Sequence, residues 1–271
     1  MKTLGDQKIG AVGVGNMGAS ILEGVLTKRL TKPSLVCVYD KDQKKAAAFA
    51  RQHRVGVASS LTVLLQKADV VLLAMKPQDF LSFSAEHKTF FRPRQCVISI
   101  LAGMTTGKIA QALGKKIAIV RAMPNLGAKV GQSMTVICGK DKKTLSFAGI
   151  FFSGCGEVAA LPEKQLDLVT AISGSGPAYF FHLMELLEDF GVQKGLPDSV
   201  AATLAVQTGL GAALLAKGAK VSCAALREMV TSKKGTTEAA LLTLKRGNFK
   251  RIFQRALVAA MDRSCQLRGG K

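Results

Sequence analysis

Short apolar runs alternate with amphipathic stretches along the first half of the chain. The apolar runs cover residues 8–14, 35–39, 70–75, 96–100, 117–122 and 134–138. Between them, apolar residues recur at helical spacing near 16–30, 42–53, 60–67, 105–114 and 141–152. This alternation predicts an α/β fold, a Rossmann-type mainly parallel sheet with helices on both faces. The unbroken apolar run at 70–75 is typical of a strand buried on both sides.

The pattern changes after Pro162. From Glu163 onward no run resembles a strand, and alanine, leucine and methionine recur at helical spacing, with helix breakers at 174–177, 191–197, 218–222, 233–235 and 247. We therefore expect a dinucleotide-binding domain over residues 1–162 and an all-helical dimerisation and substrate domain over residues 163–271. A helix such as 200–216, with few polar residues, lies at the centre of a bundle or against another subunit, and we expect a dimer formed through this half.

A glycine-rich run ends the first expected strand. Residues 9–18 read IGAVGVGNMG, in which Gly13, Gly15 and Gly18 form the pattern G-x-G-x-x-G. Gly13 permits the tight turn, Gly15 lets a pyrophosphate approach the backbone, and Gly18 lets the helix pack on the strand. Asn16 and Met17 lie where the first helical turn directs free N–H groups at phosphates. A glycine turn without a ligand is disfavoured, because the run lies between strand and helix patterns.

The end of the second expected strand bears on the choice of cofactor. Asp40 follows the glycine run by about twenty residues, where an acidic side chain accepts hydrogen bonds from the adenosine ribose of NAD. The alternative is an ordinary turn residue. Nearby Lys41, Lys44 and Lys45 are instead suited to a 2′-phosphate, so the sequence leaves NADH and NADPH both open.

Ligands of such sheets sit beyond the carboxyl ends of the strands. This rule places four residues that follow the strand at 70–75 beside the cofactor, namely Ala74, Met75, Lys76 and Pro77. Ala102, after the strand at 96–100, leaves room for a nicotinamide ring. Asn125 is suited to bind the nicotinamide amide or the substrate. The alternatives are a solvated loop lysine at 76 and a simple turn at 124–125.

Two runs in the helical half carry further chemistry. Residues 173–179 read SGSGPAY, and a helix break there would offer Ser175 and Gly176 to an anion or substrate, unless it is only a turn between helices. Residues 232–237 read SKKGTT. The helix start that follows suits a carboxylate, unless a threonine merely caps the helix. The candidate substrate residues of this second run are Ser232, Gly235, Thr236 and Thr237.

Composition narrows the functional classes. The 271 residues carry a net charge of +20, but the lysines are spread along the chain and aromatic residues make up only 6%, with no tryptophan. These features argue against nucleic-acid binding as the main role. No apolar run has transmembrane length and the N-terminus is polar, so we expect a cytoplasmic protein without a membrane partner. Six scattered cysteines and three histidines show no metal-ligand spacing, so we expect no metal site.

The order of these runs resembles the pyrroline-5-carboxylate reductase family over nearly the whole chain. The glycine run is common to many dehydrogenases, whereas the run at 173–179 followed by the turn at 232–237 is more specific. The resemblance implies reduction of 1-pyrroline-5-carboxylate to proline by NADPH or NADH. It also implies an active site formed where domains of different subunits meet. In such a site, the turn holds the substrate carboxylate and Thr237 lies beside the imine nitrogen.

The chain departs from the family pattern at the turn, where Lys233 and Lys234 replace a Pro-Gly pair. A lysine at a position of positive φ is strained where glycine is not. Ser60 is the nearest polar group where the family often has an asparagine beside Leu61, and Ala239-Ala240 replaces a small residue and glycine. These departures leave their effect on turnover and on substrate preference open. The sequence also does not determine the oligomer size beyond a dimer or the source of the imine proton.

Two other functions stay open. One is a related dehydrogenase of small hydroxy acids. That group relies on a catalytic lysine in its first helical segment, and Lys164 is a poor match because it lies before the break at 174–177. The other is a dinucleotide-binding regulatory relative that has lost turnover through the altered turn at Lys233 and Lys234.

Overall fold

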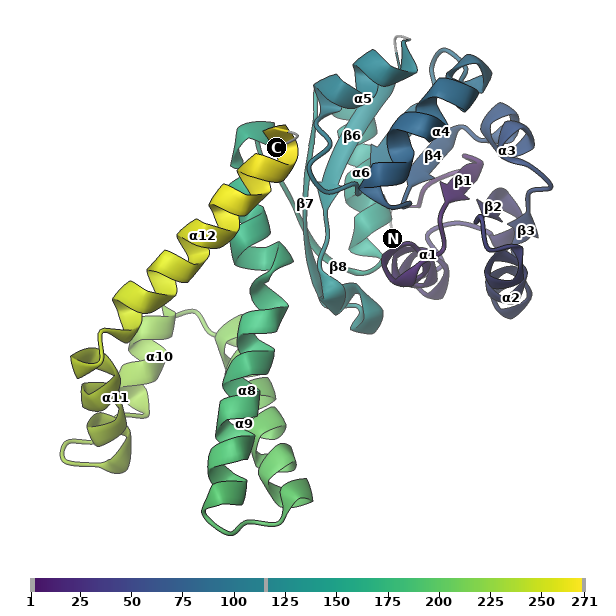
Figure 1. Ribbon diagram of the computed structural model, residues 1–271. Helices are drawn as coiled ribbons and strands as arrows, with labels where there is room; N and C mark the ends of the chain where they lie inside the picture. Colours follow the sequence, from purple (N-terminus) through teal and green to yellow (C-terminus); the bar gives the residue numbers. More distant parts are fainter. Residues whose placement is uncertain (1–2, 115–116, 270–271) are drawn as a thin grey trace. The chain divides into compact units, whose positions relative to one another are not determined.

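The structure is a computed structural model that describes residues 3–114 and 117–269 (Figure 1). Eight strands form one sheet in the order β3-β2-β1-β4-β5-β6-β7-β8. The strands are β1 Ile9–Val12, β2 Val36–Tyr39, β3 Gly56–Val57, β4 Val70–Leu73, β5 Cys96–Ser99, β6 Ala118–Met123, β7 Ser133–Gly139 and β8 Gly156–Ala160. Within the described residues every neighbouring pair is parallel except β6 and β7, which confirms the mainly parallel sheet.

Helices cover both faces of this sheet. They are α1 Asn16–Thr27, α2 Gln43–His53, α3 Leu61–Lys67, α4 Phe80–His87, α5 Thr106–Leu113 and α6 Lys142–Ser153. Ile21 and Phe151, from α1 and α6, belong to the apolar core on one face, and Phe80 and Ile109, from α4 and α5, belong to the core on the other. Four of the helices begin at residues whose side chains accept a backbone N–H of the first turn, namely Asp42, Ser60, Thr105 and Asp141. Five single turns of 3-10 helix complete this part: η1 Pro33–Leu35, η2 Pro77–Asp79, η3 Lys88–Phe90, η4 Leu126–Val130 and η5 Glu163–Gln165.

The remainder is helical, as predicted. It contains α7 Leu166–Val169, the π-helical turn η6 Thr170–Gly174, α8 Gly176–Gln193, α9 Asp198–Gly218, α10 Cys223–Met229, α11 Thr236–Arg246 and α12 Phe249–Gly269. The helix break expected at 174–177 is confirmed: the π-helical turn ends at Gly174, Ser175 is a bend, and a new helix begins at Gly176. The chain passes through the π turn into α8, and Pro177 stands in the first turn of α8, where a missing N–H costs no intrahelical hydrogen bond.

The described residues form two compact units. One contains the residues up to Gly174 together with those from Ala260 onward, and the other contains Ser175–Ala259. Helix α12 therefore begins in one unit and ends in the other. The domain boundary after residue 162 stays a prediction, and its outer limits at residues 1 and 271 lie outside the described residues.

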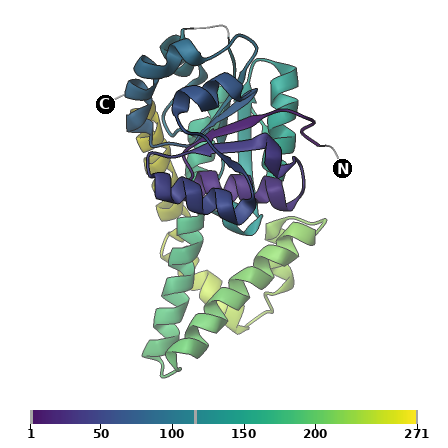
Figure 2. The same ribbon diagram turned by 90° about the vertical axis from the view of Figure 1, so that its right-hand side faces the viewer.

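In the helical unit, α8 and α9 form a hairpin that opens away from its turn (Figure 2). Near the turn the two helices pack closely. A Cβ at Gly191 would lie 3.0 Å from the Cβ of Ala201, and Ala201 and Ala205 are the buried residues of α9. Most apolar side chains of the hairpin are exposed.

The end of α12 is anchored to the unit that contains the sheet. Asp167, on α7, is buried, and its Oδ1 accepts a hydrogen bond from Ser264 Oγ at 2.8 Å. Its Oδ2 lies 3.2 Å from a guanidinium nitrogen of Arg268. Gly103 packs against the same turn of α12, where an added Cβ would lie 2.8 Å from the carbonyl oxygen of Leu267. The carboxylate of Asp167 is therefore compensated only when the last turns of α12 are in place.

We expect Arg268→Ala to lower the free energy of unfolding by about 2–3 kcal/mol, because a buried carboxylate loses its cation. The figure is below that of a fully enclosed pair because the Arg268 side chain is 37% exposed. Urea unfolding measures the loss. Arg263→Ala on the same helix is the control, since Arg263 is an exposed residue whose guanidinium donates to Gln266, and its effect should stay within a few tenths of a kcal/mol. Equal effects of the two substitutions would contradict the role given to Arg268.

Candidate cofactor pocket and substrate turn

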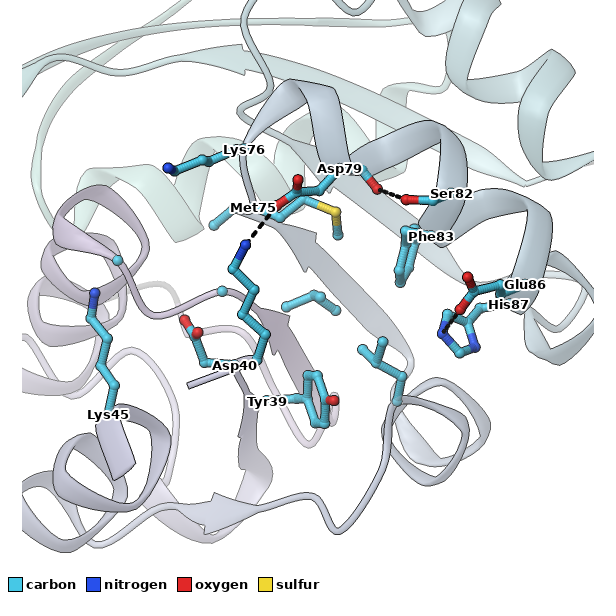
Figure 3. A pocket seen from close by; sticks show the side chains of 16 residues that line it. Tyr39, Asp40, Lys45, Met75, Lys76, Asp79, Ser82, Phe83, Glu86 and His87 are labelled. Carbon is cyan, nitrogen blue, oxygen red and sulfur yellow. Dashed lines mark hydrogen bonds and ion pairs between the residues drawn. The ribbon is translucent and has the colours of Figure 1, made fainter. Parts of the chain in front are cut away.

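A cavity of about 490 Å³ opens at the carboxyl ends of β1, β2 and β4 (Figure 3). Its volume lies in the range of ligand pockets. Several predicted cofactor residues line it, namely Gly13, Gly15, Asp40, Ala74, Met75 and Lys76. These residues come from three separate segments of the sequence. The fold therefore brings the ends of three strands to one cavity, as the strand-end rule predicts.

The three glycines of the run differ in what surrounds them. Gly13 has φ +101°, and a Cβ there would lie 2.6 Å from the carbonyl oxygen of Ala74. A Cβ at Gly18 would collide with the carbonyl oxygen of Gly13. Gly15, which precedes α1, has no atom within 4 Å of an added Cβ. Gly13 and Gly18 are therefore required by the fold itself, whereas at Gly15 a side chain fits the chain and enters the cavity.

Asp40 is held by the backbone on both sides. Its Oδ2 accepts the N–H of Val14 at 2.8 Å, and its Oδ1 accepts the N–H of Asp42 at 3.0 Å. The carboxylate thus ties the end of β2 to the glycine run. Of the three neighbouring lysines, Lys41 and Lys45 line the cavity and Lys44 does not.

Part of the cavity wall was not predicted from the sequence. Tyr39 and Leu61 line one side, and Asp79, Phe83 and His87 line the other. The last three come from η2 and α4, a helix that the sequence analysis did not predict. The spacing of Phe80 and Phe83, which both face the core, was the available signal.

Asn16 and Pro77 adjoin the lining residues Gly15 and Lys76 in the sequence, and Met17 and Gly18 follow within three residues of Gly15. None of these four lines the cavity. Ala102, exposed in the turn after β5, does not line it either.

The side chain of Asn125 is engaged by this chain. Its Oδ1 accepts the N–H of Gly127 at 3.0 Å, and its Nδ2 donates to Ser173 Oγ at 3.1 Å. The hydroxyl of Ser173 in turn donates to the carbonyl oxygen of Met134. Asn125 therefore joins the end of β6 to the π turn and to β7, and it does not line the cavity.

The turn between α10 and α11 is left-handed at Lys234, the position where the family pattern has a glycine. Lys234 has φ +58°, so this lysine carries the strain that glycine avoids. Its N–H donates to Glu238 Oε2 at 2.6 Å. Gly235 precedes α11, and a Cβ there would collide with Ser232 Oγ. The N–H of Gly235 donates to the carbonyl oxygen of Ser232 at 3.0 Å.

Thr236 and Thr237 are the first two residues of α11, and the residue that precedes the helix is Gly235, which makes no side-chain cap. The alternative that a threonine caps this helix is therefore wrong. No hydrogen bond of either hydroxyl occurs within residues 3–114 and 117–269. The two hydroxyls and the first N–H groups of α11 remain available to an anionic ligand.

Ser175 and Gly176 lie at the start of α8, in the same unit as the turn. The carbonyl oxygen of Ser175 accepts the N–H of Ala178, and Gly176 is buried. In the described part of the chain no hydrogen bond joins them to residues 232–237, and Figure 1 shows the α10–α11 turn away from the start of α8. One chain does not bring the two predicted groups of substrate residues together.

Two buried cysteines, Cys96 and Cys138, are protonated thiols. Burial raises the pKa of Cys96 to about 12 and that of Cys138 to about 11, so both stay protonated at neutral pH. Among the described residues no group of three or more histidine, cysteine or acidic side chains is arranged to hold a metal ion.

Comparison with known proteins identifies both halves. Residues 163–267 match the family model for the pyrroline-5-carboxylate reductase dimerisation domain. Residues 8–103 match the model for the coenzyme F420-dependent NADP oxidoreductase domain. A pyrroline-5-carboxylate reductase of Bacillus spizizenii is 34% identical over 268 residues, covering 96% of this chain and 89% of the relative. The Pseudomonas aeruginosa enzyme is 35% identical over 264 residues, covering 96% of each.

Solved structures agree with these matches. A pyrroline-5-carboxylate reductase from Coxiella burnetii has a TM-score of 0.91 at 35% identity, covering 97% of this chain and 98% of that one. A Plasmodium falciparum pyrroline carboxylate reductase with NADP bound has a TM-score of 0.86 at 28% identity, with the same coverage. A 3-hydroxyisobutyrate dehydrogenase of Mycobacterium tuberculosis, at 18% identity and a TM-score of 0.52 over 70% of this chain, shares the fold alone.

Proposed function

The chain belongs to the pyrroline-5-carboxylate reductase family, and on that premise we propose how its residues divide the reaction. The activity is reduction of 1-pyrroline-5-carboxylate to L-proline, the last step of proline biosynthesis. The bound NADPH or NADH supplies a hydride to the C=N carbon, and a proton goes to the nitrogen. The protein supplies mainly orientation and electrostatics.

The cavity at the carboxyl ends of the strands is the observation that supports cofactor binding there. Gly15 has no side chain and open space in front of it, so the pyrophosphate can reach the N–H groups at the start of α1. The cofactor residues in this proposal are Gly13, Gly15, Asn16, Met17, Gly18, Asp40, Ala74, Met75, Lys76, Pro77, Ala102 and Asn125. Asn125 contributes by shaping the end of β6, since its amide is engaged within the chain.

The turn before α11 is the proposed substrate site. Backbone N–H groups of Thr236 and Thr237 stand at the positive end of an 11-residue helix, which favours the substrate carboxylate. The N–H of Gly235 donates to Ser232, so Gly235 contributes by shaping the turn. The hydroxyl of Thr237 is assigned to the imine nitrogen. Ser232 supports the turn, and Ser175 and Gly176 complete the substrate residues.

One pair of assays tests this function. With pyrroline-5-carboxylate, the protein should oxidise NADPH or NADH. With a small 3-hydroxy acid and the oxidised cofactors, it should produce no reduced cofactor. Turnover only in the second assay would support a hydroxy-acid dehydrogenase. Cofactor binding without turnover in either would support a regulatory relative.

The exposed apolar faces of the helical unit require a cover. On α8, Phe180 is 64% exposed, and on α9, Leu215 is 67% exposed. The expectation that no apolar run has transmembrane length is wrong for α9, which is long and apolar enough to cross a membrane by length and composition. Only 11% of its apolar stretch is buried. Its residues fall within the match to a dimerisation domain, so the chain forms a homo-oligomer. We propose that a second copy covers these faces in a homodimer or a multiple of it. The six free thiols fit the reducing cytoplasm that the sequence predicts.

Light scattering at micromolar concentration should give at least twice the chain mass of 28.6 kDa, because the exposed faces are larger than a stable monomer tolerates. Leu214→Lys, on the exposed face of α9, should shift the protein toward smaller species by placing a charge in the contact. A stable monomer of the parent chain, or its partition into lipid vesicles in place of association, would contradict the proposed dimer.

A further inference from the structure

An ion pair joins two residues that line the cofactor cavity. Lys41 follows β2, and Asp79 ends η2 ahead of α4, so the two residues come from separate segments of the chain. The ammonium of Lys41 lies 3.3 Å from Asp79 Oδ2. Both residues line the cavity. The Lys41 side chain is 79% exposed and that of Asp79 is 39% exposed, so the pair adds little to folding stability.

The other charged groups near Lys41 do not take part in this ion pair. Asp40 gives both of its carboxylate oxygens to backbone N–H groups. Lys45 and Lys76 also line the cavity, and within the described part of the chain neither ammonium has an acidic side chain within ion-pair distance. Of the three lysines that line the cavity, Lys41 is thus the one whose ammonium is paired with an acidic side chain, that of Asp79.

We propose that Asp79 is a positioning residue that lowers the affinity for NADPH relative to NADH by holding the ammonium of Lys41. The inference rests on the proposed function. The two cofactors differ only in the 2′-phosphate on the adenosine ribose, and the end of β2 is where such sheets contact that ribose. The 2′-phosphate must compete with Asp79 for Lys41, and it is also repelled by the carboxylate of Asp40, which lines the cavity. NADH lacks the phosphate, so neither effect weakens its binding.

Removing the charge of Asp79 is expected to favour the phosphorylated cofactor. Binding of NADPH and NADH is measured directly by nicotinamide fluorescence, without substrate. In Asp79→Asn, the ratio of the Kd for NADH to the Kd for NADPH should rise by about threefold to tenfold, the scale of one exposed charge-assisted contact. The change should shrink at high salt, because exposed charges are screened.

Two further variants test whether the effect passes through Lys41. In a Lys41→Met background, Asp79→Asn should change the ratio much less, since no ammonium is left to release. Asp42→Asn is the matched control. It removes one nearby carboxylate that does not line the cavity, and asparagine can still cap α2 in its place. Its ratio should stay close to that of the parent.

Each outcome decides the matter. An unchanged ratio in Asp79→Asn, the same change in the Lys41→Met background, or an equal change in Asp42→Asn would overturn the inference. Failure of the parent chain to bind either cofactor would instead overturn the proposed function, so the two failures are distinguishable.

Discussion

Gly15→Val is expected to abolish binding of both NADPH and NADH while the chain remains folded. Nothing in the chain lies within 4 Å of a Cβ at this position, and the residue has φ −65°, so valine meets no clash or backbone strain in the protein. Its methyl groups instead fill the space where a pyrophosphate approaches the N–H groups of α1. Calorimetry or nicotinamide fluorescence measures binding, and circular dichroism with urea unfolding confirms the fold.

Gly149→Val is the matched control for this prediction. Gly149 lies in α6 of the same unit, and a Cβ there also meets nothing within 4 Å. This variant should bind the cofactor as the parent does. Gly18→Val should fail to fold, because its Cβ collides with the backbone at Gly13. A folded Gly15→Val protein with unchanged affinity would refute the placement of the dinucleotide.

Thr237→Ala is expected to lower kcat/KM for pyrroline-5-carboxylate by about tenfold or more, the scale of one hydrogen bond to a charged group. The cofactor Kd should not change. The hydroxyl makes no hydrogen bond within the described residues, so its loss removes no described contact that stabilises α11. Steady-state kinetics and direct cofactor binding separate the two effects.

Thr243→Ala is the control on the same helix. The exposed Thr243 donates its hydroxyl to the carbonyl oxygen of Ala239, away from the turn, and its removal should leave kcat/KM within about twofold, as for a surface substitution. Full activity in Thr237→Ala would show that this turn does not hold the reacting part of the substrate.

Mixing the two impaired proteins adds a further measurement. The family resemblance implies that each active site takes its cofactor pocket and its substrate turn from different subunits. Subunits carrying Gly15→Val, allowed to exchange with subunits carrying Thr237→Ala, should then regain part of the parent activity. In such a mixed dimer, one site combines an intact pocket with an intact turn. No recovery after proven exchange would argue for a site supplied by one chain.

The strands and helices that the sequence predicted are those with long apolar periodicity. β3 was missed because it contains two exposed residues, Gly56 and Val57, and β8 because its side chains are mostly half-buried or exposed. Both are edge strands that take their form from pairing with a neighbour, a contact that a local pattern does not contain. α4 was missed because it follows Pro77 closely and spans only Phe80–His87.

The residues of the candidate site also fall into two groups, those that a local sequence pattern predicts and those that only the fold brings together. The glycine run is a local pattern, so its turn, its open position and its helix start could be read from residues 13–18. The Lys41–Asp79 pair joins residues that are far apart in the sequence and depends on the fold. Asn125 was predicted to bind a ligand, yet its side-chain amide donates a hydrogen bond to Ser173, 48 residues later in the chain. A polar residue at a strand end is equally suited to bind a ligand or to hydrogen-bond another segment of the chain, and only the three-dimensional structure distinguishes these roles.

The anchoring of α12 also bears on how the protein is made. Asp167 is synthesised about a hundred residues before Ser264 and Arg268, which compensate its charge. While the ribosome is still translating the helical unit, the nascent sheet carries a carboxylate without its cation and a surface at Gly103 without its cover. The N-terminal part therefore gains the partners of Asp167 only after residues 264 and 268 have been synthesised. A chain truncated before Ser264 would lack both partners of Asp167, so the loss would destabilise the part of the protein that was translated first.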